Sequence, residues 1–202
     1  MPPRQSPRLV PTGDIRSLIE LGIRLQEVAT EHALHNVFDD GGYKELLLLR
    51  LFNLRKLYRE GDDAEDEQGR RYEVKTVARI SSRGLRKPQL DVTTEHTLTR
   101  ANIARYRQVF LWIVAVFDQS HPEAIYEIMP EPLEVYFSKW EAELLRQEKL
   151  RTTGGAPVHL NNPKIPLNFV KRYGLQVWPP RDAPLPEAVQ QALELSERLD
   201  DV

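Results

Sequence analysis

The chain has 202 residues, of which 41% are hydrophobic and 29% charged, a composition that suits one ordinary globular domain with a sizeable core. Its 28 basic and 30 acidic residues give a formal charge of −2, which excludes the binding of nucleic acid through bulk positive charge. The absence of cysteine excludes disulfides, thiolate metal sites and a cysteine nucleophile. No apolar run approaches the roughly 18 residues of a membrane span, so we expect a cytoplasmic protein without a membrane partner.

The near-neutral charge is an average over two unlike parts. Residues 182–201 hold six acids and one base, a net charge of −5, which leaves +3 for the rest of the chain. Residues 1–13 contain four prolines and no periodic pattern, so we expect a flexible N-terminal arm. The segment 186–199 has the spacing of an acidic amphipathic helix. We therefore expect 179–202 to be a C-terminal extension that follows a single domain at 14–178.

Two helices are predicted near the start of that domain. Asp14 is a suitable N-cap for a helix that reaches about Thr30, where apolar residues recur at helical spacing. A second helix is predicted from Tyr43 to about Tyr58, and four consecutive leucines at 46–49 make it apolar almost all round. Such a helix is either buried on most sides or shared with a second subunit.

Strands dominate the middle of the chain. Period-two alternation at 71–77, after a Glu-Gln-Gly turn, predicts a hairpin. The β-branched and aromatic run at 109–117 predicts a strand buried on both faces, and 124–129 predicts its neighbour. A long helix opened by Pro132, a proline-rich loop, a short helix and a last strand at 175–178 follow. Helices that flank a mixed sheet make the fold class α/β or α+β.

Two acidic residues and a lysine are the strongest candidates for chemistry. On a strand, Glu73 and Lys75 project to one face while Val74 points into the core, and Asp63 can fold back beside them from one hairpin upstream. Two carboxylates that converge with an ammonium group suit metal-dependent phosphodiester hydrolysis, in which a divalent cation neutralises phosphate charge and activates a water. The lysine orients that water and offsets negative charge. On spacing alone, a solvated Glu–Lys ion pair is the commoner explanation.

Residues 79–107 carry a local excess of positive charge. They hold seven arginines and lysines against two acids, Asp91 and Glu95, and small residues interrupt the charges at 81–84. This composition is typical of a flexible loop that contacts phosphates. The alternative is a solvated charged face. The position directly after the predicted catalytic strand favours DNA contact.

The sequence resembles the PD-(D/E)xK type II restriction endonucleases, and among them the PvuII endonuclease family. The matching stretches occur in the same order and at nearly the same intervals between about residues 18 and 178: Arg59–Ala64, Tyr72–Lys75, Ile103–Gln108, Glu123–Tyr126, Lys139–Glu141 and Asn161–Pro166. The resemblance implies a restriction-endonuclease-like core with a mixed central sheet. It divides the domain into a helical dimerisation part at 14–58, a catalytic sheet at 59–130, and a helix with a recognition loop at 131–178.

The resemblance also implies roles for the candidate residues. It assigns the Mg²⁺ ligands to Asp63, Glu73 and the backbone carbonyl of Val74, the catalytic lysine to Lys75, and a hydroxyl near the metal to Tyr106. The usual proline of the family motif is absent, because Asp62 precedes Asp63. The choice of Asp63 rests on its separation of ten residues from Glu73.

DNA contacts are implied at Asp40, His96, Thr97, Asn161, Asn162 and Lys164. Asparagine reads adenine well in the major groove, whereas an Asx turn is the alternative role of Asn161 and Asn162 before Pro163. A helix cap is the alternative role of Asp40. His96 is what remains of a family histidine cluster, since Glu95 and Thr97 replace its neighbours. An acid in a DNA groove is repelled by phosphate unless it accepts from a cytosine amino group.

The resemblance implies a homodimer that cuts both strands of a short palindromic duplex DNA site, with each subunit reading one half-site. It implies CAGCTG as the target, blunt ends with 5′-phosphates, and a cognate DNA methyltransferase as a functional rather than physical partner. Two alternatives remain on the sequence alone. One is another nuclease with this core, such as a repair or junction-resolving enzyme, and the other is a catalytically silent DNA-binding module.

Overall fold

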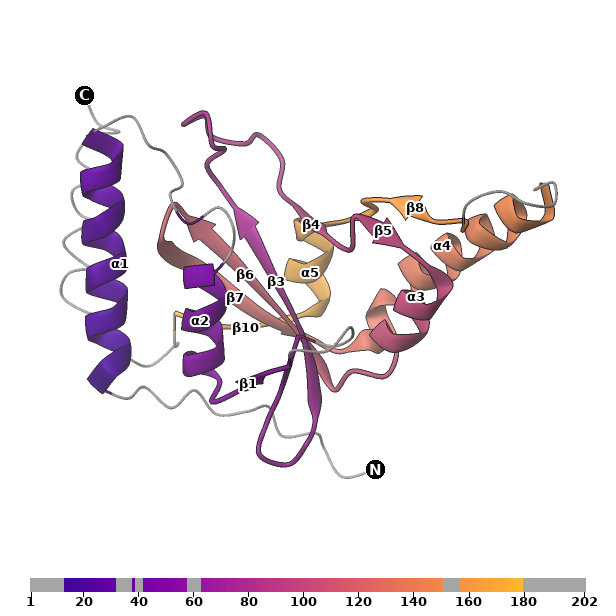
Figure 1. Ribbon diagram of the computed structural model, residues 1–202, viewed down its shortest axis with the longest axis horizontal. Helices are drawn as coiled ribbons and strands as arrows, with labels where there is room; N and C mark the ends of the chain where they lie inside the picture. The colour runs from indigo at the N-terminus through magenta and orange to yellow at the C-terminus, as the bar shows by residue number, and fades with distance from the viewer. Residues whose placement is uncertain (1–12, 32–37, 39–41, 58–62, 151–156, 180–202) are drawn as a thin grey trace.

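A six-stranded mixed sheet forms the centre of the molecule, and helices pack on both of its faces (Figure 1). The computed structural model describes residues 13–31, 38, 42–57, 63–150 and 157–179. The strand order is β1-β2-β3-β6-β7-β10, and β3 and β6 are parallel while the other neighbours are antiparallel. The strands are β1 (Arg55–Lys56), β2 (Ala64–Glu65), β3 (Arg71–Ala78), β6 (Leu111–Asp118), β7 (His121–Ile128) and β10 (Leu175–Trp178). The expected mixed sheet is confirmed.

The helices form two layers. The helices are α1 (Gly13–Glu31), α2 (Gly42–Leu51), α3 (Arg100–Tyr106), α4 (Pro130–Leu150) and α5 (Leu167–Tyr173). Apolar residues of α1 and α2 share a core with one face of the sheet, and those of α3, α4 and α5 share a core with the other. Successive β6 residues alternate between the two cores, with Ile113 in the first and Val114 in the second. The prediction of a strand buried on both faces is confirmed.

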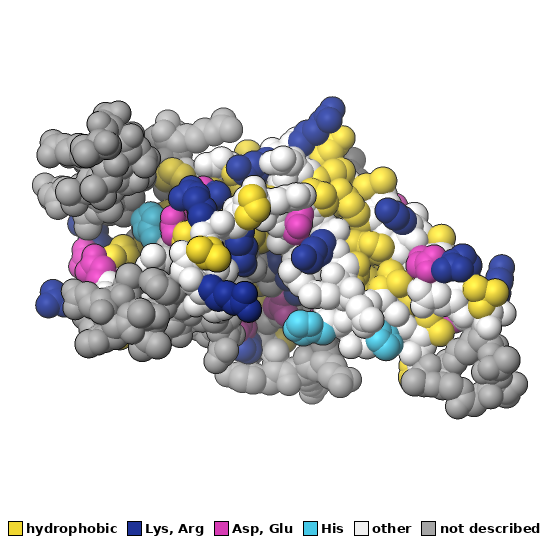
Figure 2. All heavy atoms as spheres, turned by 90° about the horizontal axis from the view of Figure 1, so that it is seen from above, with side chains coloured by type: hydrophobic (Ala, Val, Ile, Leu, Met, Phe, Trp, Pro, Cys, Tyr) yellow, Lys and Arg dark blue, Asp and Glu magenta, His cyan; other side chains and the backbone are white. Residues whose placement is uncertain are grey.

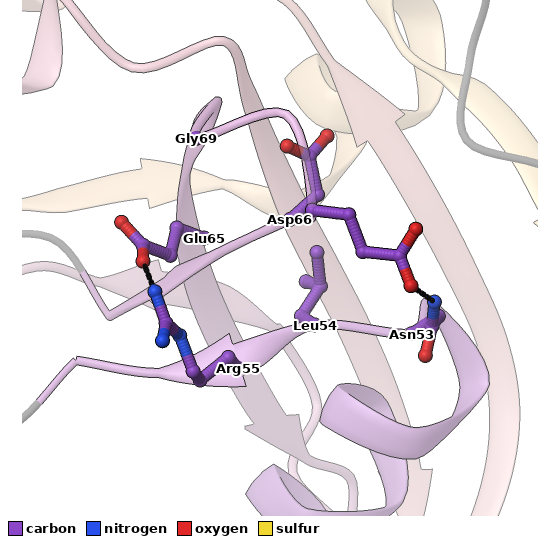
Figure 3. Close-up of a pocket in the computed structure, with 7 residues that line it drawn as sticks. Asn53, Leu54, Arg55, Glu65, Asp66 and Gly69 are labelled. Atoms are coloured by element: carbon purple, nitrogen blue, oxygen red, sulfur yellow. Dashed lines mark hydrogen bonds and ion pairs between the residues drawn. The ribbon is translucent and has the colours of Figure 1, made fainter.

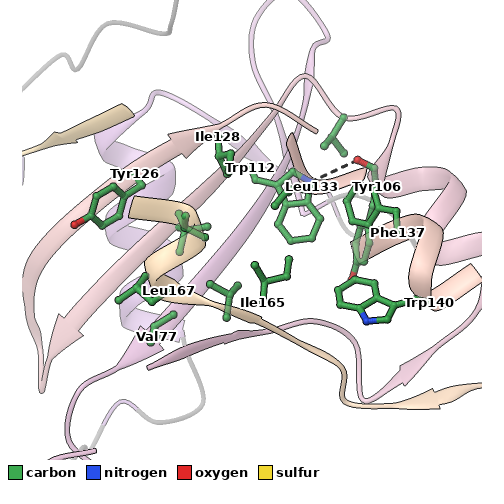
Figure 4. Close-up of a cluster of buried hydrophobic side chains, with 14 of the residues drawn as sticks. Val77, Tyr106, Trp112, Tyr126, Ile128, Leu133, Phe137, Trp140, Ile165 and Leu167 are labelled. Atoms are coloured by element: carbon green, nitrogen blue, oxygen red, sulfur yellow. Dashed lines mark hydrogen bonds between the residues drawn. The ribbon is translucent and has the colours of Figure 1, made fainter. Parts of the chain in front are cut away.

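The second core is rich in aromatic residues, as Figure 4 shows. Tyr106 of α3 packs edge-to-face on Trp112 of β6, with ring centroids 4.7 Å apart, and Phe137 of α4 lies 6.0 Å from both rings. The indole N–H of Trp112 donates to the Tyr106 carbonyl at 3.5 Å. Fully burying one such side chain contributes about 1.5–3 kcal/mol, so this cluster holds α3 firmly against the sheet.

Two short antiparallel ladders lie outside the main sheet. The strand β4 (Asp91–Thr93) pairs with β9 (Lys164–Pro166), and β5 (Thr97–Leu98) pairs with β8 (Leu160–Asn161). They join the connection between β3 and α3 to the segment that precedes α5. Residues far apart in the sequence therefore lie side by side.

The last strand closes one edge of the sheet. Leu175 and Gln176 of β10 lie opposite Glu127 and Tyr126 of β7. The indole N–H of Trp178 donates to the carbonyl of Pro122 at 2.9 Å in a buried position. The predicted strand at 175–178 is confirmed.

The second helix is shorter than predicted. It ends at Leu51, not near Tyr58, and the chain continues into β1. Asn53 has a φ of +50°, the left-handed conformation that commonly terminates helices. The amide of Leu54 then donates to the carbonyl of Leu49 at 2.7 Å, which closes the helix end. The apolar pattern does not distinguish these residues from another helical turn.

Of the remaining predictions about the chain, some are confirmed and others fall on residues that the structure does not describe. The hairpin before residue 71 is confirmed, with Gly69 at a φ of +73° in its turn. Residues 1–12 of the predicted arm at 1–13 and residues 180–202 of the predicted extension at 179–202 lie outside the described residues, and Gly13 is already the first residue of α1. Within the described parts of the chain, no helix is long and apolar enough to cross a membrane.

Candidate active site

The sheet brings Asp63, Glu73 and Lys75 together. Glu73 and Lys75 alternate with Val74 along β3, so that both point to the face opposite Val74, which lies in the core beneath α2. Asp63 precedes β2, which pairs antiparallel with the start of β3. The hairpin therefore returns Asp63 to the middle of β3. The predicted convergence of two carboxylates with one lysine is what the structure shows.

The contacts among these groups are short. The Oδ2 atom of Asp63 accepts a hydrogen bond from the Val74 amide at 2.8 Å and lies 3.6 Å from the Lys75 Nζ. The same Nζ lies 2.5 Å from Oε1 of Glu73. Glu73 is only 1% exposed, and its Oε2 has no hydrogen-bond partner among the described residues. A buried carboxylate oxygen without a donor is costly unless something else binds it.

Burial controls the protonation of the two acids. It raises the pKa of Glu73 from 4.5 to about 7, although the Lys75 ammonium opposes this effect. Burial also raises the pKa of Asp63, against the attraction of Lys75 and the hydrogen bond from Val74. Burial lowers the pKa of Lys75, but the charges of Glu73 and Asp63 outweigh it, so that this pKa is raised overall and the ammonium persists.

A divalent cation fits these groups. Among the described residues, no three His, Asp or Glu side chains lie close enough together to hold a metal on their own. The site instead offers two carboxylates, of which Asp63 lines an exposed cavity, and the Glu73 Oε2, which accepts no hydrogen bond among the described residues, is available as a ligand. Mg²⁺ is commonly held by one or two carboxylates, with water and substrate phosphate completing its shell. The donor set therefore suits a divalent cation that keeps part of its water shell better than an ion that needs a full protein cage.

Tyr106 reaches the site from the aromatic core, which lies on the side of the sheet to which Glu73 and Lys75 point. Its ring is fully buried, and its hydroxyl donates to Oε1 of Glu95 at 3.4 Å. Burial, followed by the negative charges of Glu73 and Glu95, raises the pKa of the Tyr106 hydroxyl. Since the charge of Glu73 acts on this hydroxyl, Tyr106 belongs to the electrostatic surroundings of the site, and its role near the metal stays a prediction.

Glu95 is a member of this site that the sequence did not assign to it. Its carboxylate also lies 3.4 Å from the guanidinium of Arg105, and its charge raises the pKa of both Asp63 and Lys75. The sequence identified Glu95 as a departure from the family histidines and suggested a groove contact. No local pattern shows that residue 95 and Tyr106 meet, because a loop and a helix separate them in the sequence.

The two ladders gather most of the predicted DNA-contact residues. Thr97 lies opposite Asn161 in the β5–β8 ladder, and the Asn162 amide donates to the carbonyl of His96 at 3.0 Å. Lys164 lies opposite Thr93 in the β4–β9 ladder, and its side chain is exposed. The segments around residues 93–98 and 160–166, which only the family resemblance related to DNA contact, therefore lie side by side. Asp40 lies outside the described residues.

The asparagine pair does not form the Asx turn that was the alternative. Asn162 has a φ of +52°, and its Oδ1 is buried without a hydrogen-bond partner among the described residues. Such an unpaired acceptor costs about 1–3 kcal/mol. Asn161 is exposed, and no side-chain hydrogen bond of Asn161 occurs within the described residues. The strained tip is held by the Thr94 amide and hydroxyl, which donate to the Pro163 carbonyl at 3.3 and 2.9 Å.

Two of the candidate catalytic groups, Asp63 and Lys75, line a modest cavity. Its volume is about 280 Å³, and Asp63, Val74 and Lys75 line it together with Glu45 and Lys56, which form an ion pair at 2.8 Å. A larger cavity of about 510 Å³ lies at the β1–β2 end of the sheet (Figure 3). Its lining contains none of the predicted site residues, and the ionic groups drawn there are engaged, as in the Arg55–Glu65 pair. We therefore place the candidate site at the smaller cavity.

Comparison with known protein families identifies the family of the chain. The family model described as restriction endonuclease PvuII matches residues 12–178, which is well over half of the 202-residue chain. The match covers the central sheet, both ladders and the strand β10. The chain therefore belongs to the PvuII restriction endonuclease family and is a type II restriction endonuclease.

Proposed function

We propose that the protein uses Mg²⁺ to hydrolyse both strands of a short palindromic DNA site. Restriction endonucleases act on DNA and generally use a divalent metal, and the Asp63–Glu73–Lys75 group is the observation that carries the finer proposal. The proposed target is CAGCTG, cut to blunt ends with 5′-phosphates. A cognate DNA methyltransferase would protect the same site in the host as a functional partner.

Each candidate residue would have a distinct role in the reaction. Asp63, Glu73 and the Val74 carbonyl would hold Mg²⁺, which when bound neutralises phosphate charge and activates the attacking water. Lys75 keeps its proton beside two carboxylates, so its ammonium offsets the charge that develops on the phosphate. The hydrogen bond from Val74 fixes the Asp63 carboxylate in place. The buried Tyr106 ring holds its hydroxyl and Glu95 at the rim of the site.

Recognition would come from the two ladders. The exposed Asn161 and its neighbour Asn162 would contact base edges, and His96 and Thr97 lie beside them. Lys164 and, outside the described residues, Asp40 are proposed as further DNA contacts. Because a palindrome has two-fold symmetry, a homodimer would present one such surface to each half-site.

Cleavage of phage lambda DNA tests the proposal directly. The protein with Mg²⁺ should give discrete fragments, and run-off sequencing of their ends should place the cut at the centre of one palindromic sequence. Structure-dependent nicking without discrete fragments would instead indicate a repair or junction-resolving nuclease. Intact lambda DNA over a range of temperatures and Mg²⁺ concentrations would contradict the catalytic proposal altogether.

The substitution Lys75→Ala separates catalysis from binding. Cleavage should fall by about 100-fold or more, because a preorganised charge at the transition state is lost. Specific binding of the mapped site, measured by gel shift, should persist. The matched control Lys171→Ala removes an exposed ammonium on α5 and should leave cleavage unchanged. Equal cleavage by both variants would remove Lys75 from the mechanism.

A further inference from the structure

The connection from β3 to β4 contains a small ordered hairpin at residues 79–87, here called the basic hairpin. Lys87 donates its amide to the carbonyl of Arg79 at 2.9 Å, and Ile80 bridges to Arg86 in antiparallel fashion. At the tip, the amides of Ser81 and Gly84 form two further backbone bonds of 2.9 Å within the hairpin. The sequence predicted a flexible loop here, whereas the structure shows a hairpin whose two sides are joined by backbone hydrogen bonds.

The base of the basic hairpin is tied to the sheet. The Arg79 amide donates to the carbonyl of Phe117 in β6 at 2.8 Å, and the Arg79 guanidinium pairs with Glu123 of β7. These contacts fix the direction in which the tip projects. A surface ordered in advance loses little conformational entropy on binding, which favours affinity.

The positive charges of the 79–107 segment fall into two groups. Arg79, Arg100, Arg105 and Arg107 all pair with carboxylates of the folded chain. In contrast, Arg83 and Lys87 form no ion pair among the described residues, and Arg86 has only a distant contact of 4.0 Å with Asp118. Three exposed cations on the basic hairpin are therefore left available for an external anion.

An apolar side chain lies among these cations. Leu85 is 65% exposed, although its backbone is fixed by hydrogen bonds to Ser81. Figure 2 looks down onto this end of the molecule and shows cationic side chains there with hydrophobic ones between them. Cations around one apolar contact suit a DNA groove, where phosphates border sugar and base edges.

The basic hairpin also has a suitable position. It begins four residues after Lys75 on the catalytic strand and leads into β4, which pairs with the strand that carries Lys164 (Figure 1). At about 3.3 Å per residue, its base lies roughly 13 Å beyond Lys75 along the chain. That length spans about four base pairs at about 3.4 Å each, which exceeds a three-base-pair half-site.

We propose that the basic hairpin binds the phosphates of duplex DNA flanking the recognition site, through Arg83, Arg86 and Lys87. The inference rests on the proposed function, because it assumes that duplex DNA lies across Lys75 and the two ladders. It adds a contact that reads no sequence and that lengthens the footprint of the enzyme beyond its target. Longer flanks should therefore increase affinity.

The test compares two neutralised pairs in a Lys75→Ala background, so that the DNA stays intact. One is the double substitution Arg83→Ala, Lys87→Ala, and its control of equal charge change is Lys171→Ala, Arg172→Ala on α5. The probes are duplexes that carry the mapped cleavage site with flanks of 2 or 12 base pairs on each side. A 30-base-pair duplex without the site measures non-specific binding.

The expected result is specific to flank length. The hairpin pair should lose about tenfold in affinity for the long-flank duplex and almost none for the short one, while the control pair loses little on either. On long flanks, the slope of log affinity against log salt should shrink by about 0.9 for each lost phosphate contact. Equal affinities of the hairpin pair and its parent for the long duplex would overturn the inference, as would equal losses on both lengths.

The two proposals fail in different ways. If the wild-type protein gives discrete fragments but the hairpin pair binds like its parent, only the inference fails. If the wild-type protein cuts no site, the proposed function fails, and the salt slope on the duplex without a site still decides whether the basic hairpin binds DNA. An unchanged slope there would contradict the inference as well.

Discussion

Glu73 combines burial, a neighbouring ammonium and an oxygen without a donor in one side chain. Its carboxylate form is unfavourable in the protein without metal, because burial raises its pKa to about 7. Between the ordinary pKa of 4.5 and about 7, the folded state holds a proton that the unfolded state has released. The stability associated with this proton is complete below pH 4.5 and is lost as the pH rises through 7.

Glu73→Gln should therefore flatten the pH dependence of stability. The wild-type protein in EDTA should lose free energy of unfolding on the order of 3 kcal/mol between pH 5 and pH 8 because of this group, since one pKa unit corresponds to about 1.4 kcal/mol. Urea unfolding at a series of pH values measures the loss. The control Glu148→Gln changes an exposed carboxylate on α4 and should keep the wild-type profile. A steep loss retained in Glu73→Gln would contradict the assignment.

At this scale the sequence predicted what depends on alternation and missed what depends on tertiary contact. The spacing of Glu73, Val74 and Lys75 along a strand was enough to place both charged groups on one face. The pairing of Tyr106 with Glu95 was not foreseen, because it requires α3 to pack through its aromatic residues onto β6. The backbone strain at Asn162 was equally invisible in its sequence neighbourhood.

Among the elements, the β2–β3 hairpin returns Asp63 to β3, and Asp66 organises the turn of this hairpin. The Asp66 carboxylate accepts hydrogen bonds from the amides of Gln68 and Arg70 at 3.0 and 2.9 Å, and from the Tyr72 hydroxyl at 2.8 Å. Burial raises the pKa of Asp66 and is the largest single effect, but the hydrogen bonds from Tyr72 and Arg70 together outweigh it and lower the pKa overall. Its stabilising effect is present above pH 3.8 and is lost as the pH falls through the lowered value.

Asp66→Ala should cost about 2 kcal/mol in free energy of unfolding at pH 7, because hydrogen bonds to a charged acceptor are each worth about 1.5–3 kcal/mol and the freed donors reach water. The difference from wild type should be the same at pH 5 and smaller at pH 3. Thermal unfolding at the three pH values measures it. Glu67→Ala, one residue away and exposed, is the control. A difference that does not change with pH would rule out the carboxylate as its source.

The packing of α1 on α2 depends on Gly22, which leaves room for the Tyr43 side chain. A Cβ built at Gly22 would lie 2.2 Å from the Tyr43 hydroxyl, which donates to the Leu18 carbonyl at 3.4 Å. In an open helix, Gly→Ala would stabilise by about 1 kcal/mol. Here Gly22→Ala should instead destabilise by about 1–3 kcal/mol, since the tyrosine ring must move.

A double-mutant cycle with Tyr43→Ala checks this explanation. The two substitutions together should cost less than the sum of their separate effects, by about 1 kcal/mol or more, because the clash disappears with the ring. Urea unfolding of the four proteins gives the coupling. Additive effects would mean that Gly22 matters for some reason other than Tyr43.

The prediction of helices and strands failed where the same sequence pattern is compatible with two kinds of local structure, or where pairing joins distant segments. Apolar residues continue past Leu51, so the chain reads as helix until Asn53 turns it into β1. The ladders β4–β9 and β5–β8 each pair a segment near residue 95 with one near 163, a separation that no local signal spans. In contrast, β6 and most of β7 were predicted because their buried residues form apolar runs in the sequence.

For the whole molecule, the proposed cleavage of a palindrome would require two subunits, and α1 carries exposed apolar residues that suit the proposed interface. Leu21 is 67% and Leu25 is 51% exposed, one helical turn apart. The double substitution Leu21→Lys, Leu25→Lys should give a monomer at micromolar concentration, whereas the wild-type protein should have twice the chain mass of 23.4 kDa. Sedimentation or light scattering measures the mass.

The matched control is Leu150→Lys at the end of α4, where the leucine is 71% exposed. It should leave the mass unchanged. The α1 variant should also cut the two strands of a plasmid in separate events, so that nicked circles accumulate. A wild-type protein with the mass of one chain would contradict the homodimer, and a dimeric α1 variant would place the interface elsewhere.

The strand β10 closes the sheet with the final residues of the described domain. During synthesis, the outer edge of β7 stays open until those residues leave the ribosome, and an open edge can pair with strands of other chains. A protein shortened to end at Gly174 would retain every proposed catalytic group, yet it would expose that edge and lose the Trp178 anchor. Its expected fate is aggregation, so a minimal version of this nuclease should not end before residue 179.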